Sequence, residues 1–373
     1  MITTSLPKAG GALSCALLLL APCISSAAPS SNVQLYGIVD AGMQYLSNGP
    51  DGHSKTGVSS GNLNGSRWGL KGAEDLGDGL KAVFVLEAGM DLTNGQSLQG
   101  KRLFGRQAYV GLDSKSWGRL VFGRHNSLMI DWMAKYNPFG NAGFSGKRVD
   151  PAFSDRSDNG IKYTVKMGPV TAGAFYSFGW NNTQSWEDSK LGRMFSAGLR
   201  YQDGPLGAAV LYHSKHADSP KAGADSGNRE DRIVAGLSYK VGQFDLFGGY
   251  RWLKQRLTSQ DLRSNMYWAG VRYRPAKPTR LSLAVYHADG MVCDSMNYAV
   301  CPAEQQAGSE QKPTLVTLGG EYDLSKRTTL YAIGAYAIND NGSSVSLAGG
   351  NYGVNVEPGK NQFGLQLGMR HKF

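Results

Sequence analysis

Apolar and polar residues alternate one by one along many stretches of the chain. In the final segment, GLQLGMRHKF, the residues Leu365, Leu367 and Met369 fall on one face and Gln366 and Arg370 on the other. The same two-residue period recurs in GIKYTVKM, MFSAGLRYQ, RIVAGLSYKV and MYWAGVRYR. Because two is the side-chain period of a β-strand, the pattern predicts strands that each have one apolar and one polar face.

The apolar faces of these strands differ from those of a soluble β-sandwich. They carry Ala and Gly in the middle and Tyr or Phe toward the ends; in MYWAGVRYR, Tyr267 and Tyr273 flank Ala269 and Val271. A sandwich packs large aliphatic side chains between two sheets, whereas aromatic rings at both margins of an apolar band settle at the headgroup level of a bilayer. The strands are therefore expected to face lipid.

The connections between these strands alternate in length. Seven are short, near 77–79, 114–118, 168–169, 203–205, 242–243, 274–280 and 324–328. Eight are long, at roughly 47–65, 94–101, 127–158, 179–192, 216–230, 257–263, 290–313 and 340–361. Together they join sixteen strands, and short turns alternating with long loops are typical of outer-membrane barrels. We predict an all-β fold, a 16-stranded antiparallel transmembrane β-barrel, whose last strand pairs with the first because an open edge in lipid leaves backbone groups without hydrogen bonds.

The N-terminal segment has the features of an export signal. Lys8 precedes an apolar run from about residue 12 to 23, and the small residues Ser25 and Ala27 suit signal peptidase. We therefore expect residues 1–27 to be a signal peptide and residues 28–373 to form the barrel. The alternatives are a retained membrane helix, for which the run is short of ~20 residues, and a lipoprotein signal at Cys23, which Pro22 disfavours.

Composition agrees with an exported, strand-rich chain. Charged residues make up 18% of the sequence, and it contains 50 Gly and 18 Tyr, which suit strands and turns better than helices. Cys293 and Cys301 are separated by seven residues, and in an exported chain they are expected to form a disulfide within a loop; two free thiols are the alternative. A metal site would need further ligands nearby, so neither a metal nor a cofactor is expected.

Several motifs give the chain a family resemblance. LYGIVDAG, SRWGLKGAEDLGDGLKAVF, FGRQAYVGL, GRLVFGR and the terminal Phe373 resemble, in this order, the general diffusion porins of Gram-negative outer membranes, nearest to the β-proteobacterial type. The resemblance covers the expected mature chain. It implies a water-filled channel for passive diffusion of small hydrophilic solutes and ions, usually in a homotrimer, with outer-membrane lipids and lipopolysaccharide around it. It also implies that the barrel-assembly machinery reads Phe373, and that the third long loop folds inward to narrow the pore.

The third long loop supports this expectation by its own composition. Residues 127–158 form the longest connection and are rich in apolar side chains that could anchor them to a wall: Met129, Ile130, Trp132, Met133 and Phe139. Loops of this length are usually functional or disordered. We expect the loop to fold into the lumen; the alternative is an external cap.

The loop also contributes candidate residues at the pore constriction. The resembling family has a Pro-Glu-Phe-Gly motif here, whereas this chain has NPFG, which keeps Pro138, Phe139 and Gly140 but lacks the acidic residue. Asp131 and Lys135 precede this motif. The loss of the Glu makes the expected constriction less acidic.

Opposite the loop, the resemblance implies a cluster of arginines on the barrel wall. Motif matching assigns Arg67 and Arg106 to such positions, with Arg124 and Arg102 as further candidates. Alternation independently directs Arg67 to the lumen, on the same strand face as Lys71. The alternatives are solvated surface charges or salt bridges between subunits. If these arginines face the lumen, fixed positive charge would favour anions over cations.

Other functions remain open at this point. His125 and Ser127 lie two apart, as in outer-membrane phospholipases, but no motif supplies the partner and oxyanion hole that catalysis would need. An anion-specific porin and a basic, non-conducting adhesin are also possible, since a net charge of +10 could bind either anionic solutes or lipopolysaccharide phosphates. No nucleic-acid partner is expected. We therefore predict a non-enzymatic, anion-preferring diffusion pore in the outer membrane.

Overall fold

The computed structural model describes residues 32–49, 52–183, 185, 187–293, 295–301, 311–340, 342–348 and 356–373. The expected signal peptide, residues 1–27, lies outside these described residues. None of the helices in the described part of the chain is both long and apolar enough to cross a membrane.

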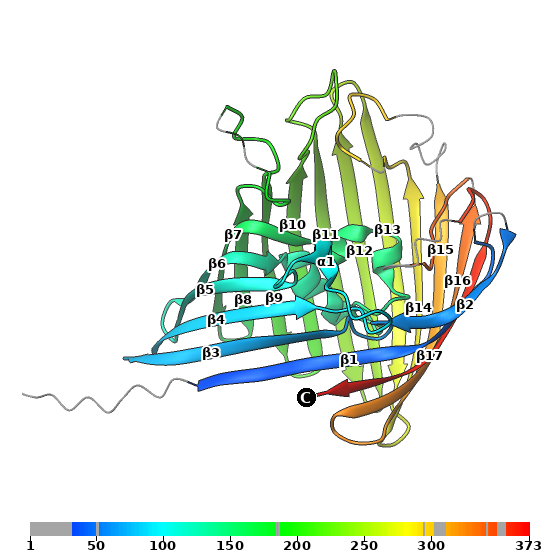
Figure 1. The fold of residues 1–373 in the computed structure, drawn as a ribbon, viewed down its shortest axis with the longest axis horizontal. Coiled ribbons are helices and arrows are strands. Elements are labelled where there is room, and N and C mark those ends of the chain that lie inside the picture. Colours follow the sequence, from blue (N-terminus) through cyan, green and yellow to red (C-terminus); the bar gives the residue numbers. More distant parts are fainter. Residues whose placement is uncertain are drawn as a thin grey trace, which may run out of the picture.

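The described residues form one antiparallel sheet that closes on itself into a barrel (Figure 1). Its strands are β1 (Asn32–Leu46), β2 (Lys55–Ser60), β3 (Arg67–Gly77), β4 (Leu80–Gly89), β5 (Gln107–Ser114), β6 (Gly118–Asn126), β7 (Arg156–Met167), β8 (Val170–Ser177), β9 (Met194–Asp203), β10 (Leu206–His216), β11 (Arg229–Val241), β12 (Phe244–Arg256), β13 (Asp261–Tyr273), β14 (Thr279–Gly290), β15 (Lys312–Asp323), β16 (Thr328–Asp340) and β17 (Gln362–Lys372). β2 and β3 both pair with β1, one with each half of it, so they form a single barrel strand interrupted at 61–66. The predicted 16-stranded barrel is thereby confirmed.

The first and last strands close the barrel. β1 pairs with β17 from Ile38 opposite Lys372 to Leu46 opposite Gly364. The backbone of Phe373 exchanges hydrogen bonds of 3.0 and 3.1 Å with that of Gly37, so the pairing continues to the final residue. The ring of Phe373 lies over Gly37, where any larger side chain would collide with it. The expected pairing of the last strand with the first is correct.

Short and long connections alternate between the two ends of the barrel, as the sequence predicts, with one exception. The connection between β12 and β13 spans only residues 257–260, shorter than the turn at 274–278 on the opposite end. The two strands continue as a paired hairpin up to Arg256 and Asp261, where their outward side chains are polar. The period-two apolar signal therefore ends before the strands do.

The two faces of the barrel wall have opposite character. Large apolar side chains are exposed on the outside along every part of the sheet, for example Leu237 at 52%, Leu283 at 41% and Leu367 at 49%. Inward positions on β17 are instead Gln362, Gln366 and Arg370, all buried. An apolar outside and a polar inside are what a water-filled barrel in lipid requires.

One long connection lies inside the barrel instead of extending from its end. Residues 127–155, called the inner loop here, join β6 to β7 and contain four short helical turns: η2 (Met129–Met133), η3 (Ala134–Tyr136), η4 (Gly146–Arg148) and η5 (Pro151–Ser154). In Figure 1 these turns lie within the ring of strands, near the short α1 (Leu98–Lys101) of the preceding loop. The prediction that the third loop folds inward is confirmed.

Candidate functional site

Apolar side chains of the inner loop fix it to the barrel wall. Met129, Ile130, Trp132, Met133 and Phe139, the anchors expected from the sequence, are all buried. The larger rings lie on wall glycines, where an added Cβ would come within about 3 Å of the ring: Trp132 on Gly173 and Gly198, Tyr136 on Gly236, Pro138 on Gly270, Phe139 on Gly319 and Phe144 on Gly364. The loop thus follows the inner wall from β8 round to β17, because glycines there leave room for it.

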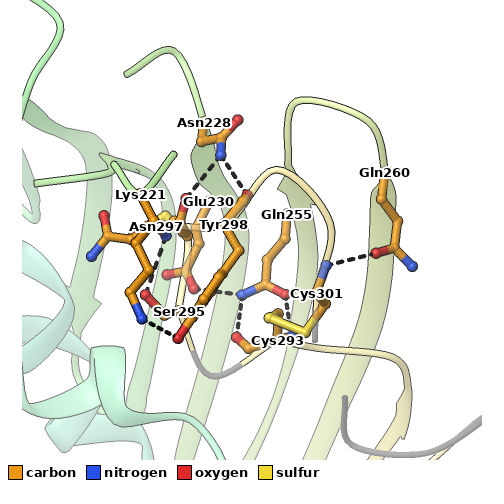
Figure 2. The surroundings of a disulfide bond; sticks show 11 residues. Lys221, Asn228, Glu230, Gln255, Gln260, Cys293, Ser295, Asn297, Tyr298 and Cys301 are labelled. Atoms are coloured by element: carbon orange, nitrogen blue, oxygen red, sulfur yellow. Dashed lines mark hydrogen bonds between the residues drawn. A yellow bond between two sulfur atoms is a disulfide. The ribbon is translucent and has the colours of Figure 1, made fainter. Parts of the chain in front are cut away.

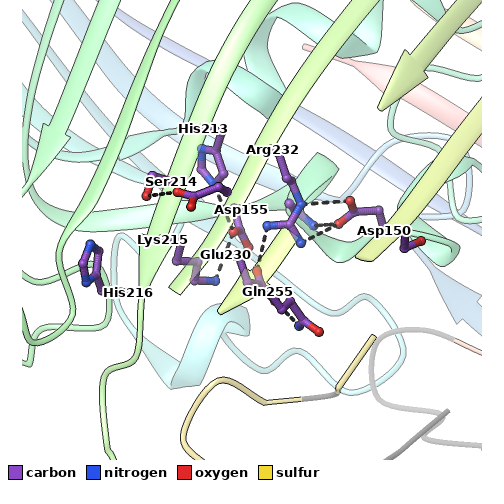
Figure 3. A network of polar contacts seen from close by, with 12 residues as sticks. Asp150, Asp155, His213, Ser214, Lys215, His216, Glu230, Arg232 and Gln255 are labelled. Carbon is purple, nitrogen blue, oxygen red and sulfur yellow. Dashed lines mark hydrogen bonds and ion pairs between the residues drawn. The ribbon is translucent and has the colours of Figure 1, made fainter. Parts of the chain in front are cut away.

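Polar contacts anchor the returning half of the loop on β10, β11 and β12 (Figure 3). The Asp150 carboxylate lies 2.9 Å from Nε of Arg232 and 2.9 Å from Nε of Arg251, and all three side chains are buried. Farther along, Asp155 pairs with Lys215 at 3.0 Å and lies 4.0 Å from Nε2 of His213. These ion pairs hold the loop on the side of the barrel away from β1 to β6.

A cavity of about 540 Å³ remains between the inner loop and the wall of β1 to β6. We call it the central cavity. The charged side chains that line it comprise five basic and two acidic residues: Arg67, Arg106, Lys147, Arg148 and Arg156, with Asp91 and Asp131. Because the loop occupies the opposite wall, this space is the narrowed part of the lumen, and its lining has an excess of positive charge.

Arg67 and Arg106 line the central cavity, as their motif positions suggested, but a third residue accompanies them. Glu87 accepts a 2.7 Å hydrogen bond from Nε of Arg106 and lies 3.9 Å from Nη1 of Arg67. Its second oxygen accepts from the hydroxyl of Tyr36 at 3.0 Å. One buried carboxylate therefore offsets part of the charge of two arginines and fixes their orientation. Sequence reasoning missed Glu87.

Arg124 has a different environment from Arg67 and Arg106. It does not line the central cavity; its Nη1 donates to Asp158 at 2.6 Å and its Nε donates to the backbone of Gly105. Arg102 donates to the same Asp158 at 2.7 Å. Through these hydrogen bonds to Asp158 and Gly105, the two arginines connect the second long loop to β7.

Asp131 lines the central cavity but is compensated. Its carboxylate accepts from Nζ of Lys162 at 2.7 Å and from Nδ2 of Asn126 at 2.9 Å. This acid therefore contributes little net negative charge to the cavity.

The NPFG segment and Lys135 lie on the other side of the loop, toward the end of the barrel with the short turns. Lys135, Pro138 and Phe139 line a second cavity of about 430 Å³, and Gly140 borders both cavities. The charged side chains of this second cavity are six basic and two acidic: Lys135, Arg272, Arg280, Lys326, Arg370 and Lys372, with Glu321 and Asp323. Positive charge thus continues past the central cavity.

Three further basic side chains line the central cavity that were not among the arginines expected there from the sequence motifs. Lys147 and Arg148 lie in η4, and Arg156 begins β7. Lys147 donates from Nζ to the carbonyl of Asn141 at 3.0 Å. Burial lowers the pKa of Lys147 to about 7, and the guanidinium groups of Arg148 and Arg156 act in the same direction. The charge of this lysine therefore depends on pH in the physiological range.

The His125 and Ser127 pair is not arranged for catalysis. Both side chains are buried, and the His125 ring packs between Tyr109 and Phe175, with centroids 4.8 and 6.1 Å away. Within the described residues neither ring nitrogen has a hydrogen-bond partner. The same part of the chain contains no cluster of three His, Cys, Asp or Glu residues able to hold a metal ion.

The cysteines lie in the loop that follows β14 (Figure 2). Cys293 and Cys301 are joined, with Cα atoms 5.7 Å apart. The bridged segment contacts neighbouring strand ends. The side-chain amide of Gln255 donates to the carbonyl of Cys293 at 2.9 Å and accepts from its backbone N–H at 2.6 Å, and the side chain of Gln260 accepts from the backbone N–H of Cys301. The disulfide thus fixes a loop segment at the end of the barrel with the long loops, and neither cysteine lines the central cavity.

Removing this disulfide is expected to loosen the loop and leave the barrel intact. Closing so short a loop stabilises it by roughly 2–3 kcal/mol, mostly through local chain entropy. The Cys293→Ser/Cys301→Ser variant should therefore be cut faster by protease within 290–313, while the heat stability of the barrel changes little. Loss of the whole fold in this variant would contradict the prediction.

A family described as Gram-negative porin matches residues 12–342. The chain is 34% identical to an outer membrane porin protein of Bordetella pertussis, over 87% of this chain and 93% of that protein. The chain belongs to the Gram-negative porins.

Other relatives agree with this membership. The outer membrane porin protein 32 of Delftia acidovorans is 32% identical over 93% of this chain and 96% of its own length. Among solved structures, an anion-selective porin from Comamonas acidovorans superposes with a TM-score of 0.77 at 28% identity, covering 92% of this chain and all of that one. The porin is therefore a non-enzymatic outer-membrane channel, as its sequence predicts, and the phospholipase alternative is set aside.

Proposed function

We propose that this porin passes small hydrophilic solutes and ions by passive diffusion and prefers anions over cations. The observation that carries the proposal is the lining of the central cavity, where five basic side chains face two acidic ones and one of those acids is paired with Lys162. Fixed charges within a Debye length of ~8–10 Å act on every ion that passes a narrow pore. The similarity to a porin described as anion-selective supports the same direction.

The proposal is tested by the zero-current potential of the purified protein in a planar bilayer. With a tenfold gradient of potassium chloride, we expect a potential of the sign given by chloride permeating faster than potassium. The magnitude should fall as the salt concentration on both sides rises, because screening weakens fixed charge. A channel that prefers potassium would overturn the proposed anion preference, and absence of any current would contradict a conducting lumen.

Lys147 gives this selectivity a predicted pH dependence. A lysine is charged below its pKa and neutral above it, so raising the pH from about 6 to about 8 should remove positive charge from the central cavity. We expect the anion preference to decrease over this interval. In Lys147→Met the change should be absent, and in Arg148→Met it should move to higher pH because a neighbouring positive charge is gone. An unchanged pH profile in Lys147→Met would refute the assignment.

Three further parts of the proposal rest on the family resemblance. The porin is proposed to act as a homotrimer, to be exported by the signal peptide at residues 1–27, and to be assembled by machinery that reads Phe373. The position of Phe373 at the end of the closing strand pair is compatible with such reading, because its ring lies on the outer surface with 44% exposure. A native mass of one chain in mild detergent would contradict the trimer.

A further inference from the structure

The outer surface of the barrel has a cluster of basic side chains at the loop end of β11, β12 and β13. The alternation that exposes Ile233 and Leu237 to the outside also places Asp231 and Arg229 on the outer face of β11. The register then fixes their neighbours. Arg229 lies opposite Arg256 on β12, and Lys254 lies opposite Arg263 on β13.

Two arginines in this cluster share one carboxylate. Asp231 accepts from Nε of Arg229 and from Nε of Arg256, both at 3.0 Å. Its other oxygen accepts from the hydroxyls of Tyr212 and Ser214 at 2.8 and 2.9 Å, and only 6% of its side chain is exposed. Asp231, itself oriented by two hydroxyl groups, therefore holds the two guanidinium groups side by side.

The guanidinium groups keep free hydrogen-bonding capacity. The side chains of Arg229 and Arg256 are 36% and 42% exposed. Both use Nε to bind Asp231, and within the described residues no acceptor is bonded to their Nη atoms. Paired Nη donors in a fixed plane match the oxygens of a phosphate group.

The charges of the cluster do not balance within the protein. Like charges directly opposite each other on neighbouring strands are destabilising, yet two such pairs occur in adjacent rows, Arg229 with Arg256 and Lys254 with Arg263. Asp231 and Asp261 offset part of this charge, the latter through a 2.6 Å contact with Lys254. The remaining positive charge would be stabilised by an external anion.

The position of the cluster relative to lipid selects the kind of anion. Directly below it on the outer face, Tyr212, Ile233 and Trp252 lie side by side in register on β10, β11 and β12. Aromatic side chains at the margin of an apolar band mark the headgroup level of a membrane. Arg229 and Arg256 lie four residues beyond this row, but their guanidinium groups reach back to Asp231, which is two residues beyond Ile233. Since two residues along a strand span roughly 7 Å, the guanidinium pair lies in the layer of lipid phosphates.

We propose that Arg229 and Arg256 form a binding site for the phosphate groups of lipid A in the outer leaflet. Because long loops of outer-membrane barrels lie outside, the site faces that leaflet. The acyl chains would lie along the exposed apolar strip of Val210, Ile233 and Leu237 below the arginine pair. The proposal depends on the outer-membrane location of the porin and is independent of its ion preference.

The test uses the full-length porin in detergent and three probes: diphosphorylated lipid A, the same lipid without phosphates, and inorganic phosphate. Titration calorimetry and native mass spectrometry should show that wild type retains the diphosphorylated lipid. In Arg229→Gln/Arg256→Gln we expect the affinity to fall by at least tenfold. Lys312→Gln, which removes one positive charge from the same end of β15, is the control and should bind like wild type.

Conductance provides a check on folding, since neither arginine lines the central cavity. If the double glutamine variant does not assemble, Arg229→Lys/Arg256→Lys is used instead. It keeps the positive charge beside Asp231 but lacks the planar, paired donors of the guanidinium groups, so it should bind diphosphorylated lipid A several-fold more weakly than wild type. Unchanged affinity in the variants that fold would overturn the proposal. So would equal binding of the phosphate-free lipid, or displacement of lipid A by inorganic phosphate at equal concentration, which would indicate a site for soluble anions.

Discussion

Replacing Arg67 and Arg106 together by glutamine is expected to abolish most of the anion preference of the pore. Both side chains line the central cavity, and Glu87 lies behind them at 2.7 Å from Arg106. A unit charge acting over about 7 Å through an effective dielectric constant of ~40 contributes roughly 1 kcal/mol, a factor of about five in the local ion ratio. Without the arginines, Glu87 no longer has its cationic partners, so the zero-current potential should move toward the cation side.

Arg124→Gln is the matched control for this double variant. Arg124 is also an arginine on the wall beside the inner loop, but its Nη1 is bonded to Asp158 and it does not line the central cavity. We expect its zero-current potential to stay close to wild type. Adding Glu87→Gln to the double variant should reverse part of the shift, because the remaining acid is removed. If Arg124→Gln changed selectivity as much as the double variant, the assignment of the cavity arginines would be wrong.

The strand pattern could be predicted from sequence because lipid imposes it on every strand. Leu367 faces lipid, and Met369, two residues farther along the strand, is also apolar and faces lipid. This two-residue period of apolar side chains allows the strands to be located and counted from the sequence alone. The same signal fails above the membrane. Asp261 and Arg263 lie in β13 although the sequence predicts a loop at 257–263, because their outward side chains meet water or headgroups and carry no apolar signal.

The candidate site was only partly predictable, for a different reason. The lumenal direction of Arg67 follows from its motif and from alternation, whereas that of Arg106 follows from its motif alone, because Arg106 lies one residue before β5. Glu87 could have been found in the same way, since it lies on the strand face of β4 that pairs inward beside them. The arrival of Lys147 and Arg148 in the cavity depends on how the inner loop turns inside the barrel, and no local period encodes that path.

The contacts that set this path join residues far apart in the sequence. Asp150 and Arg232 are separated by 82 positions, and the carboxylate also meets Arg251. Burial alone would raise the pKa of Asp150, but the two guanidinium groups outweigh it and hold the pKa well below its ordinary value. A carboxyl with a depressed pKa stabilises the folded state above its unfolded pKa of about 3.9. The contribution of Asp150 is therefore complete above about pH 4 and declines only as the pH falls further, toward the depressed pKa of the folded state.

Replacing Asp150 by alanine is expected to detach the returning half of the inner loop and widen the pore. Its removal leaves Arg251 charged and buried with no other ion-pair partner among the described residues, which costs about 3–5 kcal/mol, whereas Arg232 keeps its 2.7 Å ion pair with Glu230. The amide of Ala152, which Asp150 caps at 3.0 Å, also loses its acceptor. Single-channel recordings should show a larger and noisier conductance than wild type, and trypsin should cut after Lys147 or Arg148.

Two comparison variants separate loop release from general misfolding. Asp155→Ala removes the ion pair with Lys215, whose side chain is 15% exposed, and the 4.0 Å approach to His213, so its conductance should change far less. In Asp150→Ala/Arg232→Met/Arg251→Met both buried guanidinium groups are gone, while Glu230, whose side chain is 15% exposed, keeps its hydrogen bond from Gln255. Apolar side chains of similar length can replace a buried ion pair at little loss of stability. This triple variant should regain the barrel yield of wild type but keep the wide conductance, because the loop still lacks its ionic anchor. A wild-type conductance in Asp150→Ala would mean that the aromatic side chains on the wall glycines hold the loop without help from Asp150.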